Sequence, residues 1–352
     1  IKKQFFSSYQ MRVKLYERFR LSAQYTPEKL NKRDNLPLVE KHDEALKVMP
    51  LLFDKNGYDV TVCDAPYAGY QWIPDLSIYD DYPDIQTYLT EGKFTDNAIR
   101  EQTVKSRQRN FFCYGILKSA PLCFQEVIYN KGSYNGEIST ESGQCYGQIR
   151  TETTVATGRN QGFMDSYNVM TNLSHMTSIT EGSENTFLMM ANNLTHNPML
   201  LSEPEYEPRD NVDNTVYDSE NTERFTLNGR TLKMETDLQV IHYQSNMAAM
   251  IQLGNWFDYL RENGVYDNTR IIVVSDHGYD NNHLDDLVLE DGKDVSSYYP
   301  LLMVKDFDSE GFTTSDEFMT NADVPSLATK GVISAPLNPF SGTDLSDTHE
   351  KT

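Results

Sequence analysis

The sequence predicts an α/β fold with a mostly parallel central sheet, and two observations support that prediction. Short runs of β-branched and apolar residues, such as Ile271–Val274, are too short for helices and are typical of buried strands. Helical stretches that end in glycine precede such runs, and a helix, a glycine and a strand form half of a βαβ unit. The chain has 352 residues, 38% of them hydrophobic, which is enough for a sizeable core.

Each expected element follows from its local pattern. Residues 37–52 form an amphipathic pattern that stops at Asn56-Gly57 and leads into a strand over 59–63. The same reading predicts helices over 97–109, 160–179 and 234–262, and strands over 186–191, 270–275 and 301–304.

The segments between these elements have weaker sequence patterns for secondary structure. Residues 111–129 are apolar, and we expect a helical excursion packed on the main sheet. Residues 131–157 are rich in Gly, Ser and Thr and indicate a surface insertion. Asp323 is expected to cap a final helix, and residues 337–352 are expected to form a tail.

The charge of the chain limits its partners. The formal net charge is −21, which disfavours nucleic acid or an anionic membrane as a partner of the bulk surface. No apolar run approaches the roughly 20 residues that span a bilayer. Residues 1–24 differ, with six basic residues and one acid. They indicate either a membrane-facing amphipathic helix or, as we favour, a solvated helix or disordered terminus.

The four cysteines leave two alternatives open. Cys113 and Cys123 can close a short loop in an oxidising compartment, or all four thiols are buried or idle. Cys63 and Cys145 complete the set, and the spacing shows no zinc pattern.

The residues that carry chemistry follow the run at Ile271–Val274. Asp276 offers a carboxylate oxygen and His277 an imidazole nitrogen, at the strand end where ligands bind in open α/β sheets. Gly278 is expected to let the backbone turn sharply after them. The alternative is a polar turn in which Asp276 caps the next helix and His277 is merely exposed. The strand and its position favour a divalent-metal site.

Other strand ends add candidate residues. Trp72 and Asp75 lie in a loop after residues 59–63, where they either line a pocket or, for Trp72, simply pack. His196 follows the strand at 186–191, and a histidine there can donate to a phosphoryl oxygen or move a proton. His283 is a second metal ligand, a substrate contact, or part of an exposed acidic loop.

These motifs resemble the alkaline phosphatase superfamily, in particular the sulfatase-like branch with lipoteichoic acid synthases and phosphoglycerol transferases. The resemblance rests on the order of a long helix, Gly264, Asp267, the strand, and Asp276-His277-Gly278, and covers residues 25–336. It implies a three-layer α/β sandwich and one Mn, Mg or Zn ion held by Asp276 and His277. It also implies that His196, Trp72 and Asp75 contact the substrate.

The resemblance also implies a Thr or Ser nucleophile and a further metal-binding acid near the start of the domain. We expect both to be absent from this chain, which begins at Ile1 and is expected to be a fragment or an excised domain; Thr26 is the fallback nucleophile. The family often has a histidine where this chain has Asp64. Sulfate-ester hydrolysis is disfavoured because no Cys/Ser-x-Pro-x-Arg motif is present.

Two functions therefore remain. The first is metal-dependent phosphoryl or head-group transfer, or phosphodiester hydrolysis, on a phospholipid head group or an anionic polymer. It implies an extracytoplasmic domain of a membrane-anchored parent whose transmembrane region is not in this chain. The second is a catalytically inactive sulfatase-like domain with a binding role. Nucleic acid is not expected as a partner.

Overall fold

The structure is a computed structural model that describes residues 36–94, 97–130, 154–179, 181–182, 185–227 and 229–346. Residues 1–24, Thr26, most of the expected insertion and the end of the expected tail lie outside the described residues. The chain divides into two compact units. Unit 1 comprises Ile1–Glu91, Leu173–Asn193 and Leu253–Thr352, and unit 2 comprises Gly92–Asn172 and Leu194–Gln252. The domain boundaries read from the sequence stay a prediction.

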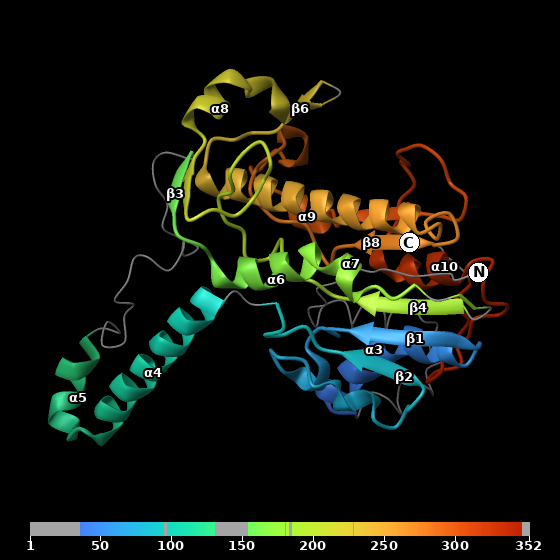
Figure 1. The fold of residues 1–352 in the computed structure, drawn as a ribbon, viewed down its shortest axis with the longest axis horizontal. Coiled ribbons are helices and arrows are strands. Elements are labelled where there is room, and N and C mark those ends of the chain that lie inside the picture. The colour runs from blue at the N-terminus through green and yellow to red at the C-terminus, as the bar shows by residue number, and fades with distance from the viewer. Residues whose placement is uncertain are drawn as a thin grey trace. The chain divides into compact units, whose positions relative to one another are not determined.

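A small parallel sheet lies in unit 1, and the protein is a mixed α/β structure (Figure 1). The sheet has the order β2-β1-β4, formed by β1 (Tyr58–Cys63), β2 (Ile85–Tyr88) and β4 (Asn185–Met190). β1 is central, and its Val60 pairs with Ile85 on one side and Phe187 on the other. The predicted strands at β1 and β4 are confirmed. β2 escapes prediction because only Ile85 of its four residues is buried.

The other two predicted strands form a second ladder. β8 (Ile271–Val274) is buried along its whole length, as predicted. It pairs antiparallel with β9 (Leu302–Lys305), and among the described strands it has no ladder with β4. The expected parallel sheet is therefore found for β1, β2 and β4 and not for β8. The β-branched run specifies burial but not the partner. Ile272 and Val274 still pack in the core that contains Phe187, and β8 points the same way as β1 and β4 in Figure 1.

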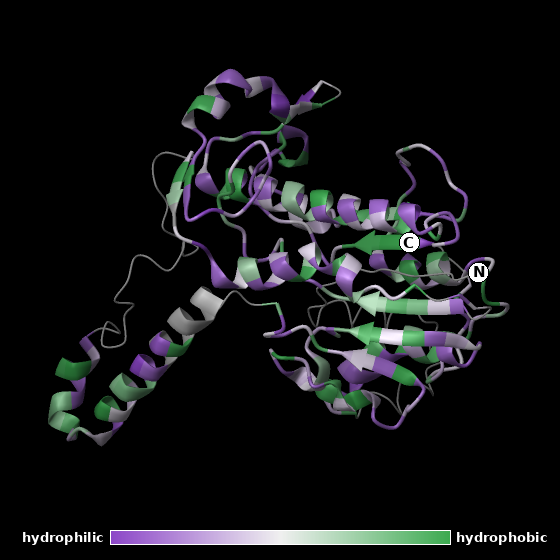
Figure 2. Ribbon diagram, in the orientation of Figure 1, coloured by the Kyte–Doolittle hydropathy of each residue, from purple (hydrophilic) through white to green (hydrophobic). Residues whose placement is uncertain are grey.

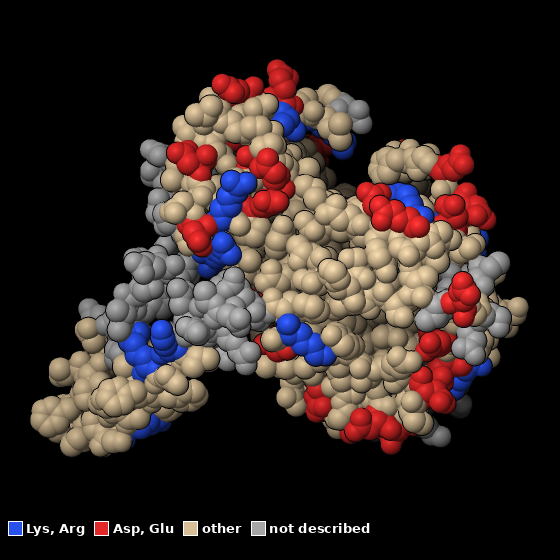
Figure 3. Space-filling model, viewed as in Figure 1, with Lys and Arg blue, Asp and Glu red and all other residues tan. Residues whose placement is uncertain are grey.

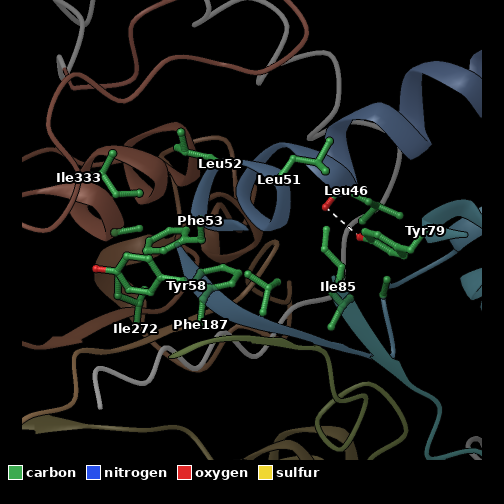
Figure 4. Packing of buried hydrophobic residues seen from close by; sticks show 14 of the residues in the cluster. Leu46, Leu51, Leu52, Phe53, Tyr58, Tyr79, Ile85, Phe187, Ile272 and Ile333 are labelled. Atoms are coloured by element: carbon green, nitrogen blue, oxygen red, sulfur yellow. Dashed lines mark hydrogen bonds between the residues drawn. The ribbon is translucent and has the colours of Figure 1, made fainter. Parts of the chain in front are cut away.

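Aromatic rings form the centre of the unit 1 core (Figure 4). The ring of Phe53 stacks on Phe187 at 4.1 Å between centroids and meets Tyr58 edge-on at 4.9 Å. The buried Tyr79 donates its hydroxyl hydrogen to the carbonyl of Leu46, at 3.1 Å. Burying one such side chain contributes about 1.5–3 kcal/mol. The helix that carries Phe53 is thereby fixed to the face of the sheet.

The helices of unit 1 are α3 (Leu38–Asp54), α7 (Leu173–Met176) and α10 (Val324–Thr329). The helix predicted over 37–52 is confirmed by α3. Asp323 forms a capping box with Thr320 ahead of α10, as expected. At the other end of α10, the guanidinium of the buried Arg270 donates to the carbonyls of Leu327, Ala328 and Lys330. A cation at a helix C-terminus satisfies its unpaired carbonyls.

Unit 2 is mostly helical. Its helices are α4 (Asn97–Ser119), α5 (Leu122–Tyr129), α6 (Gln161–Thr171) and α8 (Thr215–Glu220), and α9 (Asp237–Glu262) belongs to both units. Its strands form two antiparallel pairs, β3 (Val155–Thr157) with β5 (Asn211–Asp213) and β6 (Thr226–Leu227) with β7 (Arg230–Thr231).

The helix predicted over 160–179 is interrupted at Asn172. This residue has a non-helical conformation, and its amide donates to the carbonyl of Asn168 at 2.7 Å. Side chains of this type compete with the helical ladder, so the predicted helix is two helices, α6 and α7.

A buried polar network holds unit 2 together. The carboxylate of Glu203 accepts hydrogen bonds from Arg224 at 2.7 Å and from Gln244 on α9 at 2.5 Å. Arg224 also pairs with Asp218 and stacks over Phe225 at 4.0 Å. Burial of Asp218 raises its pKa, and Arg224 opposes that shift. A buried carboxylate is costly unless it is fully paired, so removing one partner should destabilise the unit.

The remaining general features concern thiols, charge and membranes. Cys113 and Cys123 are free thiols, so the short loop between them is not closed by a disulfide; Cys145 lies outside the described residues. Acidic side chains are distributed over the face in view in Figure 3, in agreement with the net charge of −21. Within the described residues, no helix is both long and apolar enough to cross a bilayer.

We expect Glu203→Ala to lower the free energy of unfolding by about 1.5–3 kcal/mol, because the buried hydrogen bonds from Arg224 and Gln244 are lost while Asp218 still pairs with Arg224. Urea denaturation followed by circular dichroism measures this. Glu205→Ala is the control: its carboxylate is exposed and lies 3.8 Å from the exposed Arg209, so the change should stay within about 0.5 kcal/mol. Equal losses in the two variants would contradict the structural role of the network.

Candidate functional site

The backbone just beyond β8 is held by three neighbouring segments. The N–H of Ser275 donates to the carbonyl of Leu301 at 3.0 Å, and the N–H of Leu301 donates to the Ser275 hydroxyl at 2.7 Å. The buried Asn321, at the start of η7 (Asn321–Asp323), donates to the carbonyls of Ser275 and Asp276 at 3.0 and 3.2 Å. The two residues after β8 are therefore fixed before any ligand binds.

Asp276 and His277 lie close together at this strand end. The carboxylate Oδ2 of Asp276 and Nε2 of His277 are 3.4 Å apart, with the Asp side chain 7% exposed and the His side chain 40% exposed. Nδ1 of His277 lies 2.5 Å from the carbonyl oxygen of Gly278. A carbonyl only accepts, so Nδ1 carries the proton and, in the neutral ring, Nε2 keeps its lone pair. Both outer atoms can thus act as electron-pair donors toward one cation.

Gly278 is required by a close approach rather than by a turn. A Cβ at this position would lie 2.0 Å from the carbonyl oxygen of Ser296. Its φ angle is not among the positive ones, so the sharp turn expected from the sequence is not the reason for glycine. The N–H of Gly278 donates to the carbonyl of Ser297 at 3.0 Å. Only a residue without a side chain permits this packing of the loop against the strand end.

The loop that packs on Gly278 is braced by carboxylates. Asp294 accepts from the N–H groups of Asn282 and Ser296, at 2.7 and 2.8 Å. Burial alone would raise the pKa of Asp294, but these hydrogen bonds outweigh it and the pKa lies below the ordinary value. His283 lies half-buried in the same loop. Within the described residues, no three His, Cys, Asp or Glu side chains gather as a metal-binding group, so His283 does not join Asp276 and His277 in one.

The loop after β1 is anchored by Asp64. Its carboxylate accepts from the N–H and the hydroxyl of Thr90, at 2.8 and 2.6 Å, which ties the end of β1 to the chain beyond β2. Asp64 has a φ of 53°, a left-handed conformation that Asp tolerates better than most residues. At the position where the resembled family often has a histidine, this chain therefore has a structural carboxylate.

Trp72 and Asp75 lie in this loop, near η1 (Ala68–Tyr70) and η2 (Leu76–Tyr79). Trp72 is 68% exposed and touches Tyr67 edge-on, which excludes ordinary core packing for the indole. Asp75 caps η2 by accepting from the N–H of Ser77 at 3.1 Å, and hydrogen bonds from Ser77 lower its pKa. Their predicted contact with substrate stays a prediction.

One residue at the base of this loop is not indicated by the sequence. His42 on α3 is 1% exposed, and among the described residues neither ring nitrogen makes a hydrogen bond. Its Nδ1 lies 3.5 Å from the carboxylate of Asp43, which itself accepts from the N–H of Gly69. Burial lowers the pKa of His42, and Asp43 opposes this. A histidine amid apolar helix positions carries no sequence signal of burial.

The other two predicted residues are His196 and Thr26. His196 belongs to unit 2 and is half-buried after the buried Leu194. Thr26 lies outside the described residues. The roles of both stay predictions.

No protein-family model matches the sequence, and no curated protein matches it significantly. The solved structures that are similar to the chain include the following two. The lipoteichoic acid synthase LtaP from Listeria monocytogenes is 10% identical, with a TM-score of 0.36 over 88% of this chain and 66% of that one. The phosphonate monoester hydrolase of Agrobacterium radiobacter is 12% identical, with a TM-score of 0.35 over 87% of this chain and 68% of that one.

The chain thus spans slightly less than two thirds of the length of LtaP. By its name, LtaP is a lipoteichoic acid synthase, the class of enzyme that the sequence motifs resemble. A likeness at this TM-score supports no functional inference, so the function proposed below rests on the residues of this chain.

We expect Gly278→Ala to lower the free energy of unfolding by about 1–3 kcal/mol, because the new methyl group must displace the backbone at Ser296. Gly254→Ala on α9 is the matched control, since its Cβ meets nothing within 4 Å and a helical alanine stabilises by about 0.5–1 kcal/mol. Thermal unfolding of both variants checks this. A neutral Gly278→Ala would mean that the loop does not pack against the strand end.

We expect the thermal stability to fall as the pH drops below 6.5, because the folded chain keeps His42 neutral at a pH where the unfolded chain takes up a proton. The stabilisation is complete above 6.5 and is lost as the pH approaches the lowered pKa. In unfolding scans across this range, His42→Gln should show a shallower dependence. His175→Gln, at an exposed position, should keep the parent slope, and a parent slope in His42→Gln would exclude His42 as its source.

Proposed function

We propose that the chain is a metal-dependent phosphoryl or head-group transferase, or phosphodiester hydrolase, of the sulfatase-like type. The observation that carries the proposal is the pair Asp276 and His277, whose outer donor atoms lie 3.4 Å apart at the end of β8. The motif around this pair, a strand followed by Ser275-Asp276-His277-Gly278, is the one that resembles the sulfatase-like branch. The second supporting observation is its rigidity, because Asn321 fixes the carbonyls on either side of the Asp276 Cα.

The donor geometry fits one divalent ion. Ligand atoms about 2.1 Å from a tetrahedral ion lie about 3.4 Å from each other, and Oδ2 of Asp276 and Nε2 of His277 have that separation. The protonated Nδ1 of His277 is turned to the Gly278 carbonyl, as is usual for a metal-bound imidazole. A carboxylate with an imidazole suits Zn or Mn; Mg prefers oxygen ligands.

The chain's own residues would divide the work as follows. Asp276 and His277 hold the ion, which when bound supplies Lewis-acid stabilisation of phosphoryl oxygen charge. Trp72 offers an exposed aromatic face for a head group. His196 donates a hydrogen bond or a proton to a phosphoryl oxygen. The substrate class is a phospholipid head group or an anionic polymer, and the parent protein acts at the extracytoplasmic face of a membrane.

The proposal extends to the fold around the site. A three-layer sandwich of the alkaline phosphatase type would bring the carboxyl ends of β1, β4 and β8 to one edge. The common direction of these strands in Figure 1 and the shared core of unit 1 support it. Their ends carry Asp64, Asn192 and Asp276, so the ligand-binding edge expected for such a sheet is lined with polar residues.

A catalytically inactive relative with a binding role is the second candidate. The observation that favours it is that two donors, not three, come together within the described residues. An ion held by two protein ligands binds weakly unless substrate oxygens or further residues complete its coordination. The two candidates therefore differ in metal affinity and in turnover.

We expect the intact chain to bind one Mn or Zn ion. Turnover of a chromogenic phosphodiester in its presence would show that a hydroxyl of this chain, with Thr26 as the fallback, serves as the nucleophile. Asp276→Asn removes one charged ligand and should weaken metal binding at least roughly tenfold. Mutation of residues that only hydrogen-bond to metal ligands already lowers metal affinity by about that factor. Isothermal titration with the metal alone measures affinity independently of activity.

Asp286→Asn, at an exposed carboxylate of the neighbouring loop, is the matched control and should bind metal normally. Metal binding without turnover supports the inactive relative. Binding that is the same in Asp276→Asn, His277→Ala and the parent chain would exclude this pair as the metal site.

A further inference from the structure

Helices α4 and α5 form a helical hairpin with an unusually apolar exterior. No residue of α5 is buried, although six of its eight residues are apolar or aromatic. The helical excursion expected for residues 111–129 is found in α4 and α5, and its packing on the main sheet stays a prediction. Figure 2 shows hydrophobic residues along α5 and on the part of α4 nearest to it. Exposed large side chains occur at Val104, Phe111, Phe112, Tyr114, Ile116, Leu122, Phe124, Val127 and Tyr129.

These side chains surround the helices instead of forming one stripe. Leu122, Phe124 and Val127 point in different directions around α5, at 100° per residue, and all three are exposed. A helix that is hydrophobic all round is normally buried in a protein core or in lipid. Contiguous apolar surface of this kind marks an interaction site.

The charge of the hairpin is opposite to that of the chain. Residues 97–129, which form α4 and α5, contain five basic residues and two acids, within a chain of net charge −21. On the face in view in Figure 3, the hairpin carries Lys and Arg and no Asp or Glu. The ammonium of Lys118 lies 5.5 Å from the ring centroid of Tyr114. A basic charge beside tyrosine and apolar side chains is the pattern of segments that lie in a membrane interface.

We propose that this hairpin docks the protein on an anionic lipid surface, with its apolar side chains in the interface and its basic side chains at the lipid phosphates. The eight residues of α5 extend about 12 Å, a length suited to the interface and too short to span. This inference does not depend on the proposed metal chemistry. Among the described residues it makes the hairpin the main membrane contact, because the described residues outside it carry an excess of acids and are repelled by anionic lipid.

A second copy of the chain is the competing occupant. In a two-fold symmetric dimer the same patch meets itself. Two hairpins would then bring five basic residues and two acids against an equal set, which is repulsive. An anionic bilayer, by contrast, offers acyl chains to the apolar side chains and negative head groups to the basic ones.

The test is co-sedimentation of the full chain with vesicles of phosphatidylcholine alone or mixed with phosphatidylglycerol. We expect binding to the mixed vesicles, little to phosphatidylcholine, and weakening by salt. The triple variant Phe111→Ser, Phe112→Ser, Leu122→Ser removes exposed apolar surface without touching the core. It should weaken binding roughly tenfold or more. Phe312→Ser, an equally exposed phenylalanine outside the hairpin, is the control and should leave binding unchanged.

A charge variant separates the electrostatic part. Lys105→Glu with Lys118→Glu should reduce binding to the mixed vesicles and remove its salt dependence in part. The proposal is overturned if the parent chain ignores the mixed vesicles, or if the triple variant binds them as the parent does. It is also overturned if sedimentation velocity without lipid shows a dimer that the triple variant loses, since a second copy then covers the hairpin.

Discussion

The backbone at the end of β8 is the constraint on which the candidate site depends. β9 holds it through Ser275 and Leu301, η7 holds it through Asn321, and the following loop packs on Gly278 so closely that no side chain fits there. Each contact comes from a different part of the chain. Together they place a carboxylate and an imidazole at fixed separation without a ligand. Preorganisation of this kind is what gives a polar site its strength, because no reorganisation is needed when charge arrives.

The same principle extends through unit 1. Arg270, one residue before β8, binds the last carbonyls of α10, and the buried side chains of β8 pack in the core around Phe53 and Phe187. The strand is therefore fixed at both ends and along its length. The loop after β1 is fixed in a similar way by Asp64 and Thr90. In contrast, Trp72 is exposed, and the apolar side chains of α4 and α5 have no core of their own.

The sequence predicts what is local and misses what depends on partners. β1, β4 and β8 are predictable because each is a short apolar run whose burial is visible in the chain itself. β2 is not predictable, because its strand conformation depends on its hydrogen bonds to β1 and not on an apolar pattern of its own. The antiparallel pairing of β8 with β9 is not visible in the sequence for the same reason.

The site shows the same division. Asp276 and His277 are adjacent in sequence, and a strand end predicts their convergence. Asn321 lies 45 residues from Asp276, and Thr90 lies 26 residues from Asp64, so neither support is visible in a motif. The reason for Gly278 also escapes sequence reading, since a close approach and a positive φ angle both select glycine. His42 gives no signal because burial of a polar ring is decided by tertiary packing.

The most direct test of the central claim is anomalous X-ray scattering from crystals of this chain grown with Mn or Zn. The account predicts one anomalous peak between Oδ2 of Asp276 and Nε2 of His277, with Nδ1 of His277 still turned to the Gly278 carbonyl. A peak at another place would contradict the account. So would the absence of any peak in a crystal in which the two side chains form a direct hydrogen bond. The pair would then be a structural contact at the end of β8 and not a metal site.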